Sequence, residues 1–444
     1  MNAGPSVLAL IVCATLAGCV SGEPPATLPE AKPCGIEFGD PVVLGDGGPA
    51  AFVSEPAIAF LPDGRIAVAA NWVPAHLLPI LLAGQVASVA TAQLPTGEVE
   101  PGGQNGVWLG DGTSFTALHD ELGRLSTDGH QGNQDADIAT TSDGGLHVAL
   151  FGPAGVEVLS SRDDGETWTP SGILSEPDVD RQWIAAEGQT IWVSWRNTME
   201  SGIGFARSLD AGRTWERDLE LASETFSHGP LTRANSTLLL PTQDSGDELQ
   251  VTWSMDDGQT WKKRGTGMTI ADIPGFVVPT THDNGTLRLV WTDVSSGSAA
   301  VWSSLGSLDG AWSGSAAVTP HGMNALFPWP VLRPDGSVAV FYYSSTEGGD
   351  PRNGERVWDI GFSLLCEGAA QWVHGTVAKA VHHGAMCIDG TDCPLYHPRD
   401  NNDRSVGEVF EAGVAPDGRV WVTWTATTQA EPRSYHIVVA GSKA

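Results

Sequence analysis

Residues 161–168 read SRDDGETW, and the same pattern returns as SLDAGRTW from residue 208 and as SMDDGQTW from residue 254. The copies repeat at about 47 residues, a period typical of proteins that stack one supersecondary unit per repeat, as in propellers. A unit of this size is too small to bury its own faces, so it becomes stable only when neighbouring units pack against it. The repeat therefore predicts a series of stacked β-sheet units.

Each copy has a structural explanation that requires no ligand. Its Ser and Asp can accept hydrogen bonds from the turn backbone, its Gly supplies a positive φ, and its Trp packs into the next layer. The copies resemble the Asp-box (BNR) repeats of the sialidase-like β-propellers, whose boxes lie in rim turns away from the axial site. We assign structural roles to Ser161, Asp163, Gly165, Trp168, Ser208, Asp210, Gly212, Trp215, Ser254, Asp256, Gly258 and Trp261.

A second pattern, an apolar run followed by a Gly- or Asn-centred turn and an alternating strand, counts the blades. It begins at Pro56, Asp137, Gln182, Pro230, Phe276, Pro330 and Ala412. These seven hairpins predict an all-β propeller of seven four-stranded blades, with six blades as the alternative. The hairpins would form the inner strands of each blade, and the boxes would turn between the outer strands. The last blade lacks a strand, which residues 35–45 are expected to supply, closing the ring.

The N-terminal segment predicts export. Residues 7–16 are apolar over the length of a signal-peptide core, and residues 16–19, LAGC, resemble a bacterial lipobox. The resemblance implies a signal peptide over 1–18, a lipid on Cys19 and a Pro-rich tether over 19–34. A single propeller domain would span 35–444, with insertions near 73–105 and 347–403. The expected address is the bacterial cell envelope, at the outer membrane because Val20 is not the aspartate associated with inner-membrane retention. Secretion is the alternative.

Four cysteines remain once the leader is removed: Cys34, Cys366, Cys387 and Cys393. An even number in an exported chain predicts two disulfides. The short CIDGTDC loop favours pairing Cys387 with Cys393 and Cys34 with Cys366, although four cysteines allow three connectivities.

The net charge of −30 argues against nucleic acid and anionic lipid as partners. We therefore expect a glycan or an envelope protein as partner, with membrane contact through the lipid anchor only. Neither a metal nor a cofactor is expected. The runs DGTDC and PRDNNDR contain oxygen ligands for Ca²⁺ but lack the EF-hand spacing, and a Cys/His metal site near His382 competes with the predicted disulfide.

The loops that enter the innermost strands should surround the axial channel, as should the first residues of those strands. The candidate ligand-binding residues there are Glu55, Asp135, Asp137, Asp180, Arg181, Trp183, His228, Arg404 and Glu411. Asp180 and Arg181 form a charged pair beside Trp183, which could hold a sugar by hydrogen bonds and stacking. The alternative for the pair is a local ion pair at a strand entrance.

The family resemblance implies sialic acid hydrolysis, which needs arginines to grip the sugar carboxylate, a tyrosine nucleophile and an acid. The R-I-P motif of that family corresponds here to residues 54–57, SEPA, so that Ser54 stands in place of the arginine and Glu55 would repel an anionic sugar. Tyr435 could be a nucleophile or an ordinary strand residue. The leading prediction is therefore a non-catalytic module that binds glycan or protein at the channel mouth. The alternatives are a glycoside hydrolase of the exo-sialidase type that uses the axial acids, and an assembly scaffold. No catalytic residue is assigned.

Overall fold

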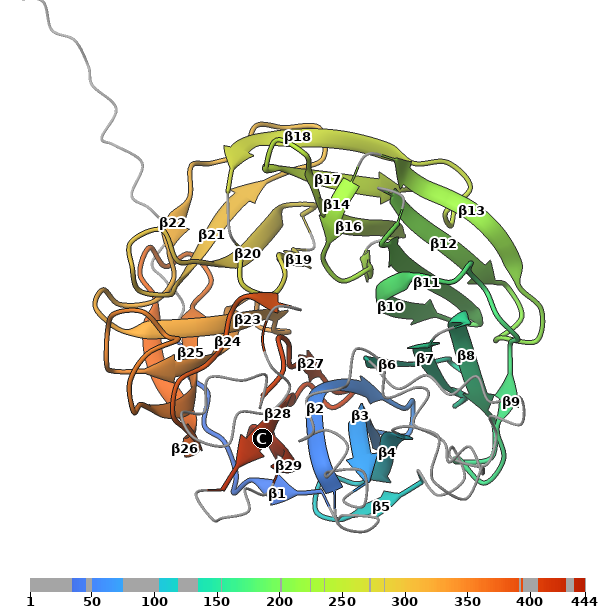
Figure 1. The fold of residues 1–444 in the computed structure, drawn as a ribbon, viewed down its shortest axis with the longest axis horizontal. Coiled ribbons are helices and arrows are strands. Elements are labelled where there is room, and N and C mark those ends of the chain that lie inside the picture. Colours follow the sequence, from blue (N-terminus) through green and yellow to red (C-terminus); the bar gives the residue numbers. More distant parts are fainter. Residues whose placement is uncertain are drawn as a thin grey trace, which may run out of the picture.

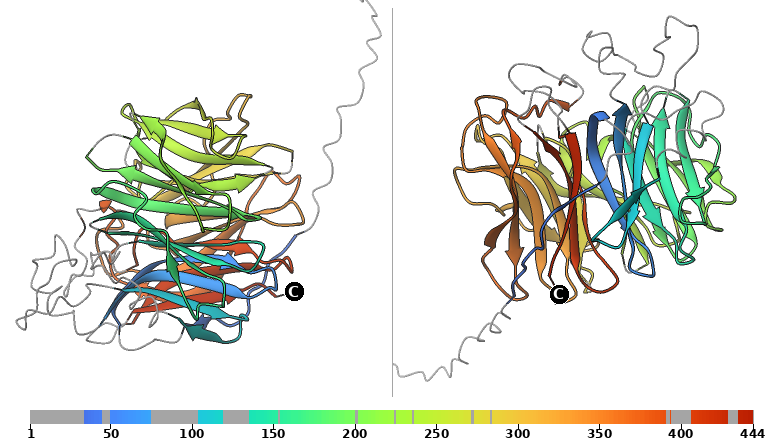
Figure 2. Two further views of the ribbon diagram at one scale, coloured as in Figure 1. Left: turned by 90° about the vertical axis from the view of Figure 1, so that its right-hand side faces the viewer. Right: turned by 90° about the horizontal axis from the view of Figure 1, so that it is seen from below.

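The seven predicted hairpins all lie in β-sheet blades, and the seven blades form a ring in the computed structural model (Figure 1). Each blade is an antiparallel sheet whose first strand lies nearest the axis, and Figure 2 shows the strands running along the short dimension of the ring. The structure describes residues 34–44, 50–74, 104–118, 135–152, 154–199, 202–223, 225–234, 236–270, 273–282, 284–390, 393, 406–428 and 435–443.

The first three blades follow one another in simple up-and-down order. Blade 1 contains β2 (Ala50–Phe60), β3 (Ile66–Pro74), β4 (Gln104–Gly110) and β5 (Phe115–Ala117). Blade 2 contains β6 (Ala136–Thr140), β7 (Leu146–Gly152), β8 (Gly155–Ser161) and β9 (Thr169–Pro170). Blade 3 contains β10 (Val179–Glu187), β11 (Thr190–Asn197), β12 (Gly202–Ser208) and β13 (Glu216–Ser223).

Blade 4 has a divided inner strand. Two short strands, β14 (Thr225–His228) and β15 (Thr232–Ala234), both pair with β16 (Thr237–Asp244), which continues to β17 (Glu248–Ser254) and β18 (Lys262–Thr269). The predicted inner strand began at Pro230, which lies in the gap between the two. Proline has no N–H to donate to a sheet ladder, so the break falls where the chain could not continue the pairing.

Blades 5 to 7 complete the ring. Blade 5 contains β19 (Val278–Thr281), β20 (Leu287–Asp293), β21 (Ala300–Gly306) and β22 (Ala316–Ala317). Blade 6 contains β23 (Asn324–Leu332), β24 (Val338–Ser345), β25 (Val357–Leu365) and β26 (Val373–His383). Blade 7 contains β27 (Ala412–Val414), β28 (Val420–Thr427), β29 (Tyr435–Gly441) and the N-terminal strand β1 (Val42–Val43).

The ring closes by pairing the two ends of the chain, as the sequence predicted. Val42 pairs with Val439 and Val43 with Val438, and Phe38 makes an isolated bridge to Ser442. The closure provides the fourth strand of blade 7 from the N-terminal segment. The outer edge of β29 is therefore paired with β1 and does not present unpaired backbone groups to another chain. The seven-blade prediction is confirmed, and the six-blade alternative is wrong because blade 7 is a separate sheet built on its own hairpin.

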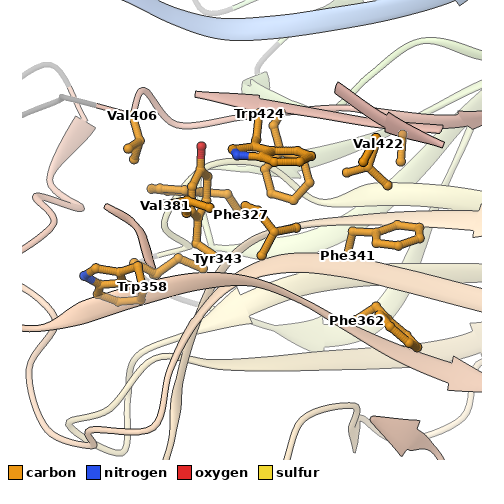
Figure 3. Close-up of a cluster of buried hydrophobic side chains, with 14 of the residues drawn as sticks. Phe327, Phe341, Tyr343, Trp358, Phe362, Val381, Val406, Val422 and Trp424 are labelled. Atoms are coloured by element: carbon orange, nitrogen blue, oxygen red, sulfur yellow. The ribbon is translucent and has the colours of Figure 1, made fainter. Parts of the chain in front are cut away.

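Apolar side chains pack between adjacent blades and hold the ring together. Figure 3 shows the cluster of blades 6 and 7, in which Tyr343, Phe341 and Trp358 of blade 6 lie beside Val422 and Trp424 of blade 7. Burial of such large side chains is the main favourable contribution to stability in a sheet protein of this kind. The result is a rigid support for residues at the axis.

The Asp boxes occupy the turns between third and fourth strands, as predicted. In the first box, Ser161 Oγ donates to Asp163 Oδ1 and accepts from the Gly165 amide, and Trp168 Nε1 donates to the Gly165 carbonyl. Asp163 also accepts two hydrogen bonds from Thr167, one from its amide and one from its hydroxyl. The Ser, Asp and Thr bonds recur in the boxes that begin at Ser208 and Ser254. These side chains close a turn, which agrees with their assigned structural role.

Both disulfides favoured by the sequence form: Cys34–Cys366 and Cys387–Cys393, with Cα atoms 5.5 and 5.8 Å apart. The first ties the N-terminal segment to blade 6 next to the ring closure. The stretch 347–403, predicted to be an insertion, contains the whole of β25 and β26, so only its remaining parts are added to the blade.

Several predictions concern residues outside the described ranges. They include the signal peptide, Cys19, the tether, Arg404 and most of the insertion near 73–105. Over the ranges that are described, no helix has the length and apolar character needed to span a membrane.

Candidate axial site

The first strands of the blades all begin at the same face of the ring, which we call the upper face, and the Asp boxes lie at the opposite, lower face. In three of these first strands a bulky residue adopts a positive φ: Glu55 (55°), Arg181 (36°) and Phe327 (56°). Each lies at a register shift in the pairing of the first strand with the second. Such bulges redirect a side chain, and left-handed backbone in residues other than glycine is strained by about 1–3 kcal/mol and concentrates at functional sites.

Arg181 is the central residue of the site. Its side chain is buried, and Nη1 lies 3.8 Å from Glu55 Oε2 and 3.6 Å from Asp135 Oδ2. Its guanidinium carbon stacks 3.8 Å above the ring of Trp183 and lies 5.5 Å from the ring of Phe276. Burial alone would lower the pKa of Arg181, but the surrounding carboxylates raise it, so the arginine stays charged.

Four buried carboxylates surround this arginine: Glu55, Asp135, Asp137 and Glu411. Burial raises the pKa of Asp137, opposed by the charge of Arg181 and by two backbone hydrogen bonds. Burial, followed by the charge of Asp137, raises the pKa of Glu411 well above its usual value. Among the described residues, one cation is therefore surrounded by four carboxyl groups, and acidic side chains outnumber basic ones inside the site.

The same carboxylates connect one blade to the next. Asp137 Oδ2 of blade 2 accepts from the Ile184 amide of blade 3 at 2.8 Å, and Glu411 Oε2 next to blade 7 accepts from the Ile58 amide of blade 1 at 3.0 Å. The amides of the innermost strands face the channel and would otherwise lack partners. Hydrogen bonds of this kind to a charged acceptor are worth about 1.5–3 kcal/mol each. These acids therefore contribute to the stability of the ring.

Residues 406–410, which precede Glu411, cover the axial residues, and we call them the cover segment. The Glu408 amide donates to Glu55 Oε1 at 3.0 Å. Val406 belongs to the cluster of Figure 3, whereas Val409 packs in a different cluster with Trp183 and Leu231 of blades 3 and 4. A segment that contacts both of these clusters and Glu55 must cross the axis.

Gly407 shows how closely the cover segment fits. It has φ +74°, and a Cβ atom at this position would lie only 2.2 Å from Glu55 Cγ. On the other side of the channel, a Cβ at Gly275 would lie 2.8 Å from the Glu408 carbonyl oxygen. Any residue other than glycine at position 407 or 275 would therefore push the cover segment away from blade 1 or blade 5. The buried carboxylates lie beneath a closely packed cover.

The structure gathers five of the predicted residues, Glu55, Asp135, Asp137, Arg181 and Glu411, into one network. The predicted pairing of Asp180 with Arg181 differs from what forms. Asp180 instead pairs with Arg196 of β11, because the positive φ of Arg181 turns its side chain inward. Trp183 is fully buried beneath Arg181 and Phe276, so its ring faces are occupied by the protein itself.

The remaining predicted residues have separate environments. His228 is buried at the end of β14, where burial and the charges of Arg196 and Arg181 lower its pKa to about 3, so the imidazole is neutral. Tyr435 lies in β29, the third strand from the axis, in the cluster between blades 7 and 1. Ser54 is buried where the sialidase comparison requires arginine. Within the described ranges, Arg181 is the only arginine that these carboxylates surround.

Sequence analysis missed three residues of the network. Asn71 of β3 donates to Glu55 Oε2 at 3.3 Å and to Asp135 Oδ1 at 3.4 Å. Gln182 Nε2 donates to the carbonyls of Asp135 and Ala149, at 2.6 and 2.9 Å. Phe276 packs edge-to-face on Trp183 with ring centroids 5.1 Å apart. Gln182 stands between two predicted residues, Arg181 and Trp183, so its polar side chain was an available signal.

The lower mouth of the channel contains a cavity of about 490 Å³. Its lining is mostly apolar, and its one charged residue, Arg233, already pairs with Glu187 and Asp257. Ligand sites usually combine an apolar lining with a few converging polar groups. The lower mouth lacks such groups among the residues that line it.

A Cys/His metal site near His382 would need cysteine thiolates as ligands. Cys387 and Cys393 are instead joined in a disulfide. His382 itself is buried, with Nδ1 2.7 Å from Thr427 Oγ1. No group of three or more potential metal ligands occurs in the part of the chain that the structure describes.

Comparison with known proteins supports the fold. No family model matches the chain, and no curated protein matches its sequence. Among solved structures, an ulvan lyase of polysaccharide lyase family PL25, bound to -[GlcA(1-4)Rha3S]-, has 11% identity and a TM-score of 0.53, covering 90% of this chain and 95% of the lyase. A Penicillium chrysogenum α-L-arabinanase has 12% identity and a TM-score of 0.45 over 91% of this chain and 98% of its own. The NanB sialidase of Streptococcus pneumoniae has 13% identity and a TM-score of 0.43, over 91% of this chain and 70% of its own. The propeller fold is thus shared with the ulvan lyase.

Proposed function

We propose that this protein is a non-catalytic glycan-binding propeller that takes a neutral or basic glycan at the upper mouth of its channel. The observation that carries the proposal is the closed state of the axial network. Arg181 is surrounded by the protein's own carboxylates, and residues 406–410 cover them. Charged groups that are buried and ion-paired in this way have no solvent-exposed face to offer a substrate.

The charge of the network decides which glycans fit. A sialidase-type site grips the sugar carboxylate with several arginines, and such a grip requires guanidinium donors that are free to form two parallel bonds. Here one arginine faces four acids, so the potential at the axis is negative. An anionic sugar would be repelled, whereas a neutral sugar or an amino sugar would not.

Asp180 and Arg196 are the groups that we assign to ligand contact. They form an ion pair across the first two strands of blade 3, and their side chains are 27% and 34% exposed. A carboxylate and a guanidinium together offer acceptors and donors to sugar hydroxyls, and both remain accessible to solvent. The neighbouring Met199 is 80% exposed and adds an apolar surface for a sugar ring.

A glycan array tests the proposal, followed by calorimetric titration of any bound glycan. Neutral or amino-sugar glycans should bind at the upper mouth, sialylated ones should not bind there, and a fluorogenic sialoside should not be hydrolysed. Asp180→Asn and Arg196→Met should each weaken binding at the upper mouth about tenfold, the value of one charged hydrogen bond. The matched control is the Asp63–Arg65 pair of the lower face, where Asp63→Asn and Arg65→Met should leave the affinity unchanged. Preferential binding of sialylated glycans that is weakened by Asp180→Asn or Arg196→Met would contradict the proposal.

The second candidate function is a glycoside hydrolase that uses the axial acids. It is favoured by one observation, the raised pKa values of Asp137 and Glu411, because a buried carboxyl that keeps its proton can act as a general acid. This function requires displacement of the cover segment. It predicts turnover that is lost in Glu411→Gln, whereas the binding proposal predicts no turnover at all.

A further inference from the structure

A second arginine, Arg288 of blade 5, is buried without a carboxylate. It lies in β20, and its side chain is only 6% exposed. Nη1 donates to Ser303 Oγ of β21 at 3.0 Å, and the buried Nε has no hydrogen-bond partner. The guanidinium carbon lies 5.3 Å from the ring of Trp372, next to β26 of blade 6. The side chain therefore sits between blades 5 and 6.

Three other arginines of the described ring make the same contact with a tryptophan, and all have acidic partners; one is Arg181 of the axial network, over Trp183. Arg233 lies over Trp192 and pairs with Glu187 and Asp257. Arg419 lies over Trp421 and pairs with Asp417 at 2.6 Å. Arg288 makes no such pair with any described residue. The Arg–Trp contact thus recurs around the ring, and among the described contacts only that of Arg288 lacks an acidic partner.

An uncompensated buried charge is expensive, and proteins normally pair it or neutralise it. Burial lowers the pKa of Arg288 to about 10, with no opposing contribution from a nearby acid, so the group remains charged at neutral pH. In a chain of net charge −30, an unpaired cation is also unusual. The position lacks the one component that would stabilise it, a negative charge.

Residues beside Arg288 and Ser303 reach the solvent on the outer side of the seam. Trp372 is only partly buried, and Ala316 of β22, which pairs with Ser303, is exposed. The guanidinium plane presents donors in a fixed fork that matches the oxygens of a carboxylate or sulfate. A small oxyanion could receive bonds from Arg288 and Ser303 together and lie beside the indole.

We propose that Arg288, Ser303 and Trp372 form an oxyanion-binding site at the outer seam of blades 5 and 6. The ligand is a carboxylate or sulfate group, either as a free ion or as part of a larger molecule such as an acidic sugar. The site is separate from the axial network and does not depend on the function proposed for the upper mouth.

The test is calorimetric titration of the purified protein with sodium sulfate, sodium acetate and sodium glucuronate, each against chloride at equal ionic strength. One site per chain should titrate with at least one of the three. Sulfate or acetate alone would identify a free ion, and tighter binding of glucuronate would identify an acidic sugar. Arg288→Met should weaken the binding by about tenfold or more, the value of a charged hydrogen bond. Arg419→Met, the matched arginine that already has an acid, should leave the binding unchanged.

Ser303→Asp provides a second variant that does not remove the arginine. It places a carboxylate where Ser303 Oγ now accepts from Arg288, so the variant should unfold at a higher temperature than the wild type and lose its response to added anions. The proposal is overturned if none of the three anions binds the wild type. It is equally overturned if Arg288→Met and the wild type bind them alike.

Discussion

Replacement of Arg181 by methionine tests the axial network most sharply, because it removes the only cation among the described residues that faces the four buried acids. Methionine retains an unbranched apolar side chain against Trp183 but leaves Glu55 and Asp135 without their ion pairs. Breaking a buried pair by removing one partner typically costs about 3–5 kcal/mol, since the remaining charge stays buried. We expect a loss of that size in the free energy of unfolding at pH 8.

The pH dependence of this loss gives the prediction a sign. Without Arg181 the pKa values of Asp137 and Glu411, which burial already raises, rise further above their unfolded values. A carboxyl with a raised pKa in the folded state contributes to stability while it is protonated, at low pH. That contribution is lost as the pH rises through its folded-state pKa. The deficit relative to the wild type should therefore be smaller at pH 5 than at pH 8.

Urea unfolding followed by tryptophan fluorescence measures both effects. Arg196→Met is the control, because its partly exposed pair with Asp180 should be worth at most about 1 kcal/mol. A deficit for Arg181→Met below about 1 kcal/mol at pH 8, or one that grows on acidification, would refute the reasoning.

Three further predictions concern other parts of the chain. Gly407→Ala should cost about 2 kcal/mol more than Gly64→Ala in urea unfolding, because both glycines have positive φ but only Gly407 faces a side chain at 2.2 Å; equal costs would mean that the cover segment packs loosely. His147, whose pKa is lowered to about 4 chiefly by burial, contributes stability that is present above pH 6.5 and lost as the pH falls towards 4. Between pH 6.5 and pH 4 the free energy of unfolding of His147→Gln should therefore fall by about 3 kcal/mol less than that of the wild type. Parallel plots of the free energy of unfolding against pH for the two proteins would contradict this. Cys19→Ala should abolish metabolic labelling with a fatty acid and release the protein from the membrane fraction, and unchanged labelling would place the lipid elsewhere.

The blades were predictable because their signals are local. A glycine turn between an apolar run and an alternating strand specifies one hairpin, and the hairpin that begins at Ala412 established blade 7 although its Asp box is absent. Likewise Val42 and Val43 were expected to complete that blade because its own strands end one short. Such features depend on a few neighbouring residues and therefore appear in the sequence.

The sequence predicted which residues belong to the site, but not how they pair with one another. Charged residues at the starts of inner strands must meet near the axis, which is why Glu55, Arg181 and Glu411 were found. Their pairing was not predictable, since it depends on the left-handed backbone at Glu55 and Arg181, and that conformation is imposed by packing. The path of Gly407 across the channel likewise depends on contacts with residues more than 100 positions away, for which the sequence contains no local signal.

The most direct test of the account is a search for product with the glycan that binds best. The purified protein would be incubated with that glycan in excess, and the mixture examined by mass spectrometry for hydrolysed or unsaturated fragments. We predict saturable binding with the glycan recovered intact. Fragments that form with the wild type and disappear with Asp137→Asn or Glu411→Gln would show that the axial acids reach a substrate, and the non-catalytic proposal would be wrong.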